Sequence, residues 1–394
     1  MGSAPADLVR TIYVDGSQGR TPRLPTDLTT LEDAAAKELT ATAFGYVSGN
    51  AGAGATSDAN RVAFDRWRLL PRMLRNTAAR DLSVSLFGQR LPSPVLLAPV
   101  GAQTVVHPEG ELASARGAAD AGVPVVLSTA ASHTLEDVAA ATGDRPRWFQ
   151  LYWPSDRTVA ESLVRRAEAA GYMALVVTVD APAFGYRPAD LNHGYLPFLQ
   201  GAGIANFTSD PAFRAGLPDG ADNAAVVAHW ARIFANPTLA WDNLAWLRSL
   251  TRLPILLKGI LHPDDARLAM EHGVNGLVVS NHGGRQLDGA VAALDALPAV
   301  RAAVGDSVPV LLDSGVRTGT DVVKALALGA DAVLYGRPYL YGLALDGERG
   351  VTHVLRCLLA ELDLALALTG CTSIDDIGPG LLAPPGPLAI PLHS

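Results

Sequence analysis

The chain has 394 residues, of which 49% are hydrophobic and 18% are charged, so it can bury one large core or two ordinary ones. Its net charge of −8, without a basic stripe, argues against a nucleic-acid partner. Apolar runs are shorter than a membrane span and the N-terminus lacks a signal-peptide pattern, so we expect a cytoplasmic protein with no membrane partner. Cys357 and Cys371 give neither a disulfide framework nor metal-ligand spacing, and we expect both to be buried structural residues.

Three regions are predicted from composition and pattern. Residues 1–92 combine polar, proline-rich and short helical segments and should pack as an N-terminal extension on the main domain. Residues 93–370 carry a repeating strand and helix pattern, interrupted by an insertion over 181–253. Residues 371–394 form a proline-rich tail that we expect to be extended, lying along a neighbouring subunit or moving freely.

The central region contains short runs of β-branched and apolar residues, each continuous rather than alternating. Such runs are typical of parallel strands that are buried on both faces. They lie at 94–100, 123–129, 147–152, 174–180, 254–259, 276–281, 308–315 and 331–336.

Helical patterns with recognisable end signals separate these strands. One ends at Gly122, the next has Ser155 and Asp156 as candidate caps, and a later one begins at Thr318 or Thr320. Strands that alternate with helices eight times predict an α/β fold, the closed (β/α)8 TIM barrel. A doubly wound open sheet is the alternative, and the even spacing of the units favours closure.

The insertion over 181–253 is far longer than a βα loop requires. Because it follows the fourth strand at the mouth of the predicted barrel, it is a candidate lid. A disordered surface loop is the alternative, which the aromatic residues of the segment disfavour. These aromatic residues are Phe184, Tyr186, Tyr195, Phe198 and Phe207.

Polar or chargeable side chains follow nearly every predicted strand, although the strand bodies are apolar. Active sites of (β/α)8 barrels lie at these carboxyl ends. So many convergent residues predict a large polar site for a ligand bigger than a small substrate. The strand-end residues are Pro99, Gly101, Ser128, Gln150, Tyr152, Thr178, Asp180, Lys258, Ser280 to Arg285, Asp313 to Arg317, Gly336 and Arg337.

The last two strand ends predict a phosphate site. Arg317 lies between glycines just before a helix, and Arg337 follows Gly336. Backbone N–H groups at a helix N-terminus together with two guanidinium groups suit a phosphate, and phosphate sites at this place recur in the fold. A mononucleotide cofactor is therefore indicated. The alternative is a salt bridge of Asp313 with the two arginines that closes the barrel.

The segment SNHGGRQLDG follows the sixth strand and carries the predicted chemistry. Its two glycines allow a tight turn that places His282 at the barrel mouth, and Arg285 can point to the same space. A base beside a guanidinium suits proton abstraction from a hydroxy acid whose carboxylate the arginine holds. Asp180, at another strand end, can bind the imidazole and stabilise its cationic form.

Long collinear motifs from about residue 28 to about residue 375 resemble the family of FMN-dependent 2-hydroxy-acid oxidases and dehydrogenases. The motifs are SNHGGRQLDG, LLDSGVRTGTDVVKALALGADAVLYGRP, APVGAQTVVHPEGE, WFQLYW and LLKGI. The resemblance implies FMN as cofactor and His282 with Asp180 as catalytic pair. It implies substrate contacts from Tyr46, Tyr152, Arg187 and Arg285. It implies flavin contacts from Pro99, Val100, Gly101, Ser128, Gln150, Thr178, Lys258, Ser280, Asp313, Gly315, Arg317, Gly336 and Arg337.

Within the family, RPADLNHGYLPFLQG, NFTSDPAF, the long lid and Gly101 are most similar to lactate 2-monooxygenase. This implies oxidation of a short (S)-2-hydroxy acid, L-lactate, by O2 to acetate and carbon dioxide, in a homotetramer or homo-octamer. An oxidase that releases the 2-oxo acid and hydrogen peroxide, or that accepts a bulkier acid, is the alternative. A non-catalytic flavin-binding barrel is a third, which His282 disfavours. After Tyr46 the chain lacks the acidic pair that relatives often carry.

Overall fold

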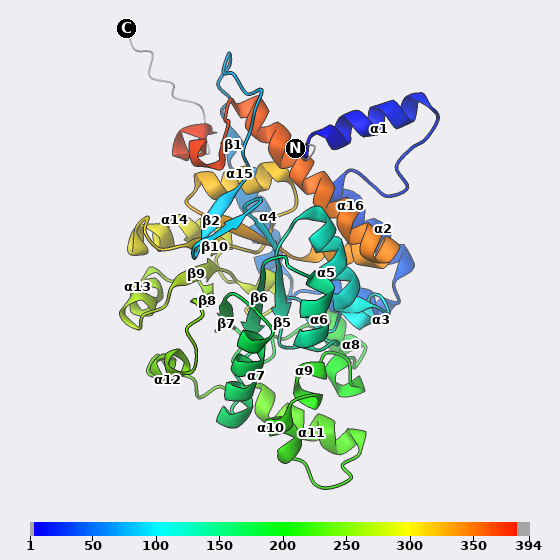
Figure 1. Ribbon diagram of the computed structural model, residues 1–394, viewed down its shortest axis with the longest axis vertical. Helices are drawn as coiled ribbons and strands as arrows, with labels where there is room; N and C mark the ends of the chain where they lie inside the picture. The colour runs from blue at the N-terminus through cyan, green and yellow to red at the C-terminus, as the bar shows by residue number, and fades with distance from the viewer. Residues whose placement is uncertain (1–3, 384–394) are drawn as a thin grey trace.

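The computed structural model describes residues 4–383 and contains a closed barrel of eight parallel strands, in the order β10-β11-β4-β5-β6-β7-β8-β9 (Figure 1). The predicted (β/α)8 barrel is therefore confirmed, and the open sheet is wrong. Seven of the eight strands lie inside a predicted apolar run, and β8 extends one residue beyond the run predicted at 254–259. The strands are β4 (Val95–Leu97), β5 (Val125–Ser128), β6 (Arg147–Leu151), β7 (Leu175–Thr178), β8 (Ile255–Ile260), β9 (Gly276–Val279), β10 (Val310–Leu312) and β11 (Ala332–Tyr335).

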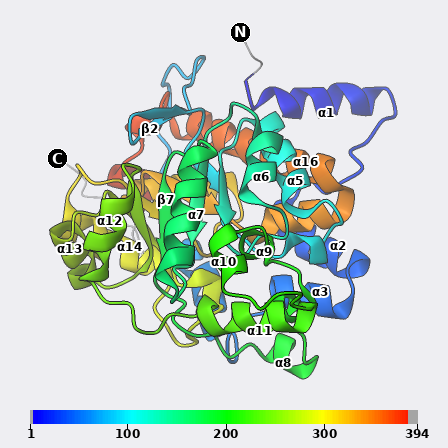
Figure 2. The same ribbon diagram turned by 60° about the horizontal axis from the view of Figure 1, so that its bottom comes forward.

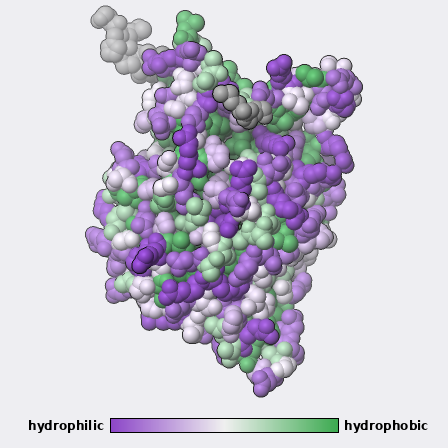
Figure 3. Space-filling model, viewed as in Figure 1, coloured by the Kyte–Doolittle hydropathy of each residue, from purple (hydrophilic) through white to green (hydrophobic). Residues whose placement is uncertain are grey.

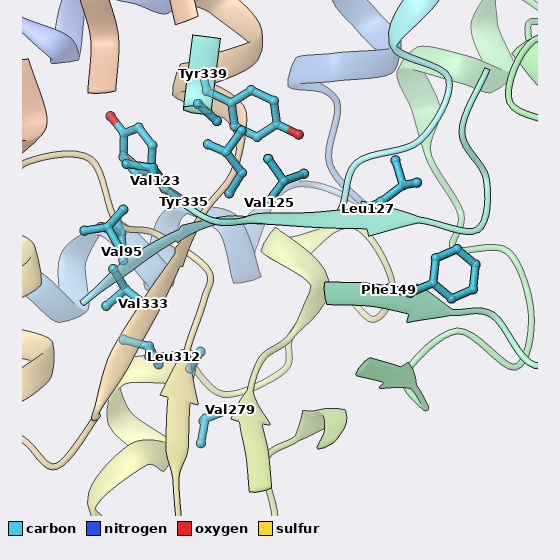
Figure 4. Close-up of a cluster of buried hydrophobic side chains, with 14 of the residues drawn as sticks. Val95, Val123, Val125, Leu127, Phe149, Val279, Leu312, Val333, Tyr335 and Tyr339 are labelled. Carbon is cyan, nitrogen blue, oxygen red and sulfur yellow. The ribbon is translucent and has the colours of Figure 1, made fainter. Parts of the chain in front are cut away.

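Both faces of the strands are buried, which explains why their apolar runs are continuous. Leu96 and Trp148 point into a cluster made mostly by strand residues, which fills the barrel interior. Val125 and Leu127 lie on the opposite face and pack with helix residues in a second cluster. Figure 4 shows these two side chains on the same face of β5. Since successive strand residues alternate between the two clusters, neither face tolerates a polar residue until the strand ends.

Helices surround the barrel and begin and end at the predicted signals. Gly122 ends α5 in the left-handed conformation with a φ of 73°. Asp156, not Ser155, caps α7, and Thr318, not Thr320, caps α15 through a reciprocal capping box. These helices are α5 (Gly110–Ala121), α6 (Leu135–Thr142), α7 (Arg157–Ala169), α13 (Pro263–Glu271), α14 (Ala293–Val304), α15 (Gly319–Ala327) and α16 (Arg337–Thr369), the last broken at Asp346 and Gly347.

The N-terminal residues wrap the barrel in short elements. Helix α2 packs on α16, and α4 packs on α14 and on the segment after β9. Helix α1 projects from the body (Figure 1). The hairpin of β2 and β3 inserts Leu86 and Leu91 into the interior cluster, where the Phe87 ring lies 5.6 Å from that of Trp148 and closes the amino-terminal mouth of the barrel. The elements are α1 (Asp7–Ser17), α2 (Leu31–Glu38), α3 (Ala41–Ser48), α4 (Ala55–Asp65), β1 (Arg68–Leu69), β2 (Val84–Leu86) and β3 (Gln89–Leu91).

The structure describes the C-terminal segment as far as residue 383. Its last strand β12 (Leu382–Ala383) pairs antiparallel with β1. Cys357 and Cys371 are both buried, as predicted. Within residues 4–383, none of the helices is long and apolar enough to cross a membrane. The prediction of an extended tail otherwise falls on 384–394, outside the described residues.

The insertion between β7 and β8 is folded, so the disordered loop is wrong. Its helices α8 to α11 lie at one end of the molecule, whereas α12 lies at the side near α13 (Figure 1), and Figure 2 brings that end forward. Phe207, Phe213 and Trp230 are at most 1% exposed and form its core. The surface seen in Figure 3 mixes polar and apolar residues. The elements are α8 (Pro188–Asn192), η3 (Pro197–Gln200), α9 (Ala205–Thr208), α10 (Pro211–Ala215), α11 (Asn223–Phe234) and α12 (Asn243–Leu250).

The hairpin at the amino-terminal mouth should contribute to stability. Leu91→Ala removes a fully buried side chain from the interior cluster and should lower the free energy of unfolding by about 2–5 kcal/mol. Arg90→Ala, on the same strand but 72% exposed, is the control and should change it by less than about 0.5 kcal/mol. Urea unfolding measures both. Equal stability of the two variants would contradict a packing role for the hairpin.

Candidate active site

A cavity opens at the carboxyl ends of the barrel strands, under the insertion. Its wall combines residues of strand ends, of α3, and of the insertion. Most of the predicted site residues line it. These are Tyr46, Pro99, Val100, Gly101, Tyr152, Arg187, Lys258, His282, Arg285, Asp313, Gly315, Arg317, Gly336 and Arg337.

The remaining predicted residues lie behind this wall and hold it by hydrogen bonds. The Ser128 hydroxyl donates to the Gln150 amide oxygen at 2.9 Å, and the Gln150 amide nitrogen donates to the Thr178 hydroxyl at 2.9 Å. Ser280 accepts from the Lys258 ammonium group at 2.9 Å. These four side chains are buried and each has a hydrogen-bond partner near the ends of the apolar strands, and the fifth residue behind the wall, Asp180, binds His282.

His282 and Asp180 form a buried pair. The imidazole Nδ1 donates to Asp180 Oδ1 at 2.8 Å, which leaves Nε2 as an acceptor. Tyr152 places its hydroxyl 3.3 Å from Nε2 and lines the same cavity. The free lone pair of the base therefore faces the cavity, and the predicted pair is brought together.

The pKa values of this pair move in the direction that general-base chemistry requires. Burial lowers the pKa of His282, and the nearby Lys258 and Arg187 cations act in the same direction. Burial alone would raise the pKa of Asp180, but His282 and Lys258 outweigh it and the net pKa is lowered. At neutral pH the imidazole is therefore neutral and the carboxyl group is ionised.

The backbone of the segment after β9 is strained, and the N-terminal extension holds it in place. His282 has a φ of 60°, a left-handed conformation that non-glycine residues rarely adopt. The neighbouring Asn281 exchanges two side-chain hydrogen bonds with Asn60 of α4, at 2.8 and 2.9 Å, and both side chains are buried. A Cβ atom at Gly284 would lie 2.7 Å from the Ser57 nitrogen, so this close approach requires glycine.

A second clamp joins the two segments beyond Gly284. The Asp288 carboxylate accepts from the backbone nitrogens of Ala53 and Thr56, at 2.8 and 2.9 Å. Thr56 in turn donates through its hydroxyl to the Leu287 carbonyl oxygen at 3.0 Å. The stretch around residues 51–60, whose sequence lacks the expected acidic pair, thus supports the loop that carries His282.

Lys258 is a buried cation paired with Asp313. Its ammonium nitrogen lies 2.8 Å from Asp313 Oδ2, and the lysine side chain is 4% exposed. Burial alone would lower the pKa of Lys258, but Asp313 and Asp180 outweigh it and raise the pKa. Asp313 therefore binds the lysine rather than Arg317 or Arg337, and the alternative salt bridge that closes the barrel is wrong.

Two arginines meet at the lid side of the cavity. Arg285 donates to the carbonyl oxygens of Val47 and Gly49, and the Arg187 Nε donates to the Arg285 carbonyl oxygen at 3.1 Å. The Tyr46 ring lies 5.5 Å from the Arg285 guanidinium carbon. Burial, together with the Arg187 and Arg337 cations, lowers the pKa of Arg285 to about 9. Such crowding of buried cations favours binding of an anion.

Burial also shifts the pKa values of the two cavity tyrosines. It raises the pKa of Tyr46 to about 12, although the nearby arginines oppose the shift. It also raises the pKa of Tyr152. Both hydroxyl groups therefore remain protonated at neutral pH and can donate hydrogen bonds into the cavity.

At the far end of the cavity, Arg317 and Arg337 stand beside two glycines. Gly315 has a φ of 98°, and a Cβ atom there would lie 2.7 Å from the Asn60 carbonyl oxygen. Arg337 donates to the Gly283 carbonyl oxygen at 3.0 Å and to the Asn50 amide oxygen at 2.7 Å. Two cations with no carboxylate between them suit a phosphate group.

Comparison with known proteins agrees with this geometry. The model of the FMN-dependent dehydrogenase family matches residues 35–384. L-lactate oxidase of Lysinibacillus sphaericus is 46% identical over 88% of this chain and 90% of its own, and human 2-hydroxyacid oxidase 1 is 45% identical over 84% and 89%. A crystal structure of mandelate oxidase aligns with a TM-score of 0.81 and 43% identity, covering 91% of this chain and 98% of that one.

The chain belongs to the FMN-dependent dehydrogenase family. It is therefore an oxidoreductase that uses FMN to oxidise 2-hydroxy acids. The cavity fits this cofactor. Its cationic far end suits the phosphate, the buried carboxylate and hydroxyl groups suit the ribityl chain, and Lys258 provides a cation for an anionic flavin ring.

Several residues in or next to the cavity were not assigned a role from the sequence. Phe234, at the end of α11, lines the cavity and is the centre of an aromatic cluster, with its ring 4.6 Å from that of Trp230 and 5.2 Å from that of Tyr152. Gln286 also lines it and accepts from Arg187 at 3.0 Å. The Asn60 contact joins positions 221 residues apart. No local signal marks Phe234 or Asn60, whereas Gln286 stood inside the motif SNHGGRQLDG.

Loss of the amide pair should disturb the catalytic loop. Asn60→Ala leaves the buried Asn281 amide without its partner and should lower the free energy of unfolding by about 1–3 kcal/mol. Asp58→Ala, on the exposed side of the same helix, is the control. Thermal unfolding of the FMN-loaded proteins measures the difference. If both variants unfold at the same temperature, the hydrogen-bonded pair of Asn60 and Asn281 does not stabilise the loop.

Proposed function

We propose that the chain oxidises a short (S)-2-hydroxy acid, foremost L-lactate, and that O2 reoxidises the cofactor. The observation that carries the proposal is the cavity-facing base of the His282–Asp180 pair, beside two arginines that bind no carboxylate through a hydrogen bond in the described structure. The relatives named L-lactate oxidase support lactate as the first substrate to test.

In this proposal the substrate carboxylate binds to Arg187 and Arg285, and Tyr46 adds a hydrogen bond. The two guanidinium groups can each present paired N–H donors to a carboxylate. Burial makes this anchor strong because water does not compete well for the buried cations. The anchored acid then lies in the same cavity as His282 and Tyr152.

His282 then takes the proton of the substrate hydroxyl at Nε2, assisted by the Tyr152 hydroxyl. Ionised Asp180 stabilises the imidazolium that results, because its oxygen already accepts from Nδ1. FMN, when bound, accepts the two electrons. Lys258, held by Asp313 and Ser280, provides a fixed positive charge for the reduced cofactor.

The cofactor assignment is proposed residue by residue. Arg317, Arg337, Gly315 and Gly336 would hold the phosphate end. Asp313 and Ser280 would hold the ribityl chain. The ring would contact Pro99, Val100, Gly101, Ser128, Gln150, Thr178 and Lys258. A cytoplasmic location and a homotetramer or homo-octamer stay predictions from the sequence.

We further propose that product and peroxide react before release, so that lactate and O2 yield acetate, carbon dioxide and water. Residues of the insertion line the cavity and support its role as a lid, among them Phe184, Arg187, Phe198 and Phe234. A closed lid retains the 2-oxo acid beside hydrogen peroxide, and decarboxylation then competes with escape. A bulkier aromatic acid is the second candidate substrate, favoured by the aromatic wall and by the similar mandelate oxidase structure.

Replacing the base should separate cofactor binding from chemistry. His282→Gln should keep the bound flavin, while bleaching of its absorbance by L-lactate without oxygen slows by about 10²- to 10⁴-fold. His262→Asn, at the exposed start of α13, is the control and should bleach at the normal rate. Stopped-flow absorbance gives both rates. If the flavin of His282→Gln bleached at the normal rate, His282 would not be the base.

Product analysis in air tests the fate of the 2-oxo acid. The native enzyme should form one acetate and one carbon dioxide for each O2 consumed. Phe234→Ala opens the aromatic wall and should raise the peroxide released per turnover by about tenfold, the effect of ~1.4 kcal/mol on two competing steps. Leu199→Ala, 55% exposed on the lid, is the control. Stoichiometric peroxide from the native enzyme would identify an oxidase, and turnover of mandelate in preference to lactate would favour the bulkier acid.

A further inference from the structure

A buried carboxyl group, Asp190, stands behind the arginine pair and has no place in the chemistry described above. It lies on α8 of the lid, one turn after Arg187, and is 9% exposed. Its Oδ2 atom lies 3.9 Å from Arg187 Nη1, within ion-pair distance but too far for a hydrogen bond. Its Oδ1 atom is buried without a hydrogen-bond partner.

Such an arrangement is costly for a group with a purely structural role. A buried carboxylate normally accepts several hydrogen bonds, and an unpaired oxygen forfeits that stabilisation. Among the ion pairs of residues 4–383, Asp190 is the carboxylate that reaches Arg187, and none reaches Arg285. Asp190 is therefore the counter-charge of the arginine pair before an anion arrives.

The packing of α8 fixes the position of this group. Helix α3 lies against α8, where a Cβ atom at Gly45 would contact that of Ala189 at 3.4 Å and one at Gly49 would contact it at 3.2 Å. The Tyr195 nitrogen donates to the Asp190 carbonyl oxygen at 3.0 Å. Asp190 thus has little freedom to turn toward water when the charge beside it changes.

We propose that Asp190 exchanges its negative charge for that of the substrate. It is ionised while the arginine pair is empty, and it takes up a proton from solvent when the carboxylate of a 2-hydroxy or 2-oxo acid binds to Arg187 and Arg285. The inference rests on the proposed function, because it needs these two arginines to hold the carboxylate. Asp190 is then a positioning residue that sets affinity and its pH dependence without touching the reacting atoms.

The electrostatic surroundings of Asp190 support this exchange. Burial raises its pKa, although the cations Arg285, Arg187 and His193 oppose the shift. A substrate carboxylate that binds to the same arginines cancels their effect and adds a like charge, so the pKa rises further on binding. Between the free and bound pKa values, binding takes up a proton, and the dissociation constant therefore rises as the pH rises.

Other titratable groups that face Asp190 or the arginines can be separated from it. Tyr46 from α3, with a pKa of about 12, and Tyr195, whose pKa is raised, stay protonated at neutral pH. Arg285, with a pKa of about 9, stays charged up to ~pH 8. Protonation of His282 would also favour an anion, so the test uses the His282→Gln background. His193 acts on Asp190 through its charge, so the control site is His262, which is exposed at the start of α13.

The experiment uses FMN-loaded His282→Gln and the double variant His282→Gln/Asp190→Asn, with pyruvate as the probe. Flavin absorbance gives the dissociation constant from ~pH 5 to ~pH 8, and calorimetry in buffers of different ionisation enthalpy counts protons. In the single variant the dissociation constant should rise with pH, with uptake of up to about one proton per pyruvate. The double variant should take up none and bind pyruvate about tenfold more tightly at ~pH 8, because a like charge has been removed. His282→Gln/His262→Gln should behave as the single variant.

The outcomes distinguish the two proposals. Equal proton uptake with and without Asp190 would overturn the charge exchange. Binding that Asp190→Asn weakens by one factor at every pH would also overturn it, because the carboxyl group then only anchors Arg187. In either case, bleaching of the native enzyme by lactate would leave the proposed function standing. If pyruvate perturbs the flavin in no variant and lactate does not bleach the native enzyme, the proposed function fails and the exchange fails with it.

Discussion

Buried charge at the carboxyl end of the barrel is the constraint on which the site depends. Lys258, Arg187, Arg285 and Arg337 all lie in one low-dielectric cavity, and only part of their charge is balanced by carboxylates within ion-pair distance. Removing a cation from water is costly unless an anion compensates it. The excess positive charge is therefore a built-in requirement for anions. In the proposed function, the phosphate of the cofactor meets that requirement at Arg317 and Arg337, and the carboxylate of the substrate meets it at Arg187 and Arg285.

The same constraint explains why two carboxyl groups behave differently. Asp180 accepts from His282 and lies near Lys258, so its pKa falls and it stays ionised to support the imidazolium. Asp190 has an ion-pair contact but an oxygen with no hydrogen bond, so burial dominates and its pKa rises. Burial acts on both groups, and the charges of His282 and Lys258, together with the His282 hydrogen bond, therefore give Asp180 a lowered pKa where that of Asp190 is raised.

Much of the barrel chemistry could be predicted from the sequence because it is local. A continuous apolar run indicates a strand buried on both faces, and the first polar residue after it marks the end where a site can form. Lys258 and Asp313 follow this rule, and they meet across the cavity. Their pairing was not predictable, since it depends on how strands β8 and β10 tilt around the closed barrel. The sequence alone is therefore equally compatible with a salt bridge between Asp313 and Arg317.

Contacts between distant segments lay beyond such local rules. Asn60 and Phe234 stand in helices whose patterns indicate only a buried face, and nothing nearby marks one residue as a hydrogen-bond partner or a cavity wall. Their roles arise when α4 reaches the loop of His282 and when α11 folds over the barrel mouth. Sequence reasoning could place the insertion over the site from its position in the chain, but not its side chains.

The residues at the strand ends and the residues of the insertion have different tasks in the site. The base, its carboxylate and the buried lysine belong to strand ends, where the closed sheet fixes them within hydrogen-bond distance. Arg187, Asp190 and Phe234 belong to the insertion, which contacts the substrate side of the cavity. A change in the insertion can thus alter which acid binds, at which pH, and how long the product stays, while the proton transfer remains the same. In the proposed function, the folded insertion therefore controls selectivity on a barrel whose chemistry is set by its charges.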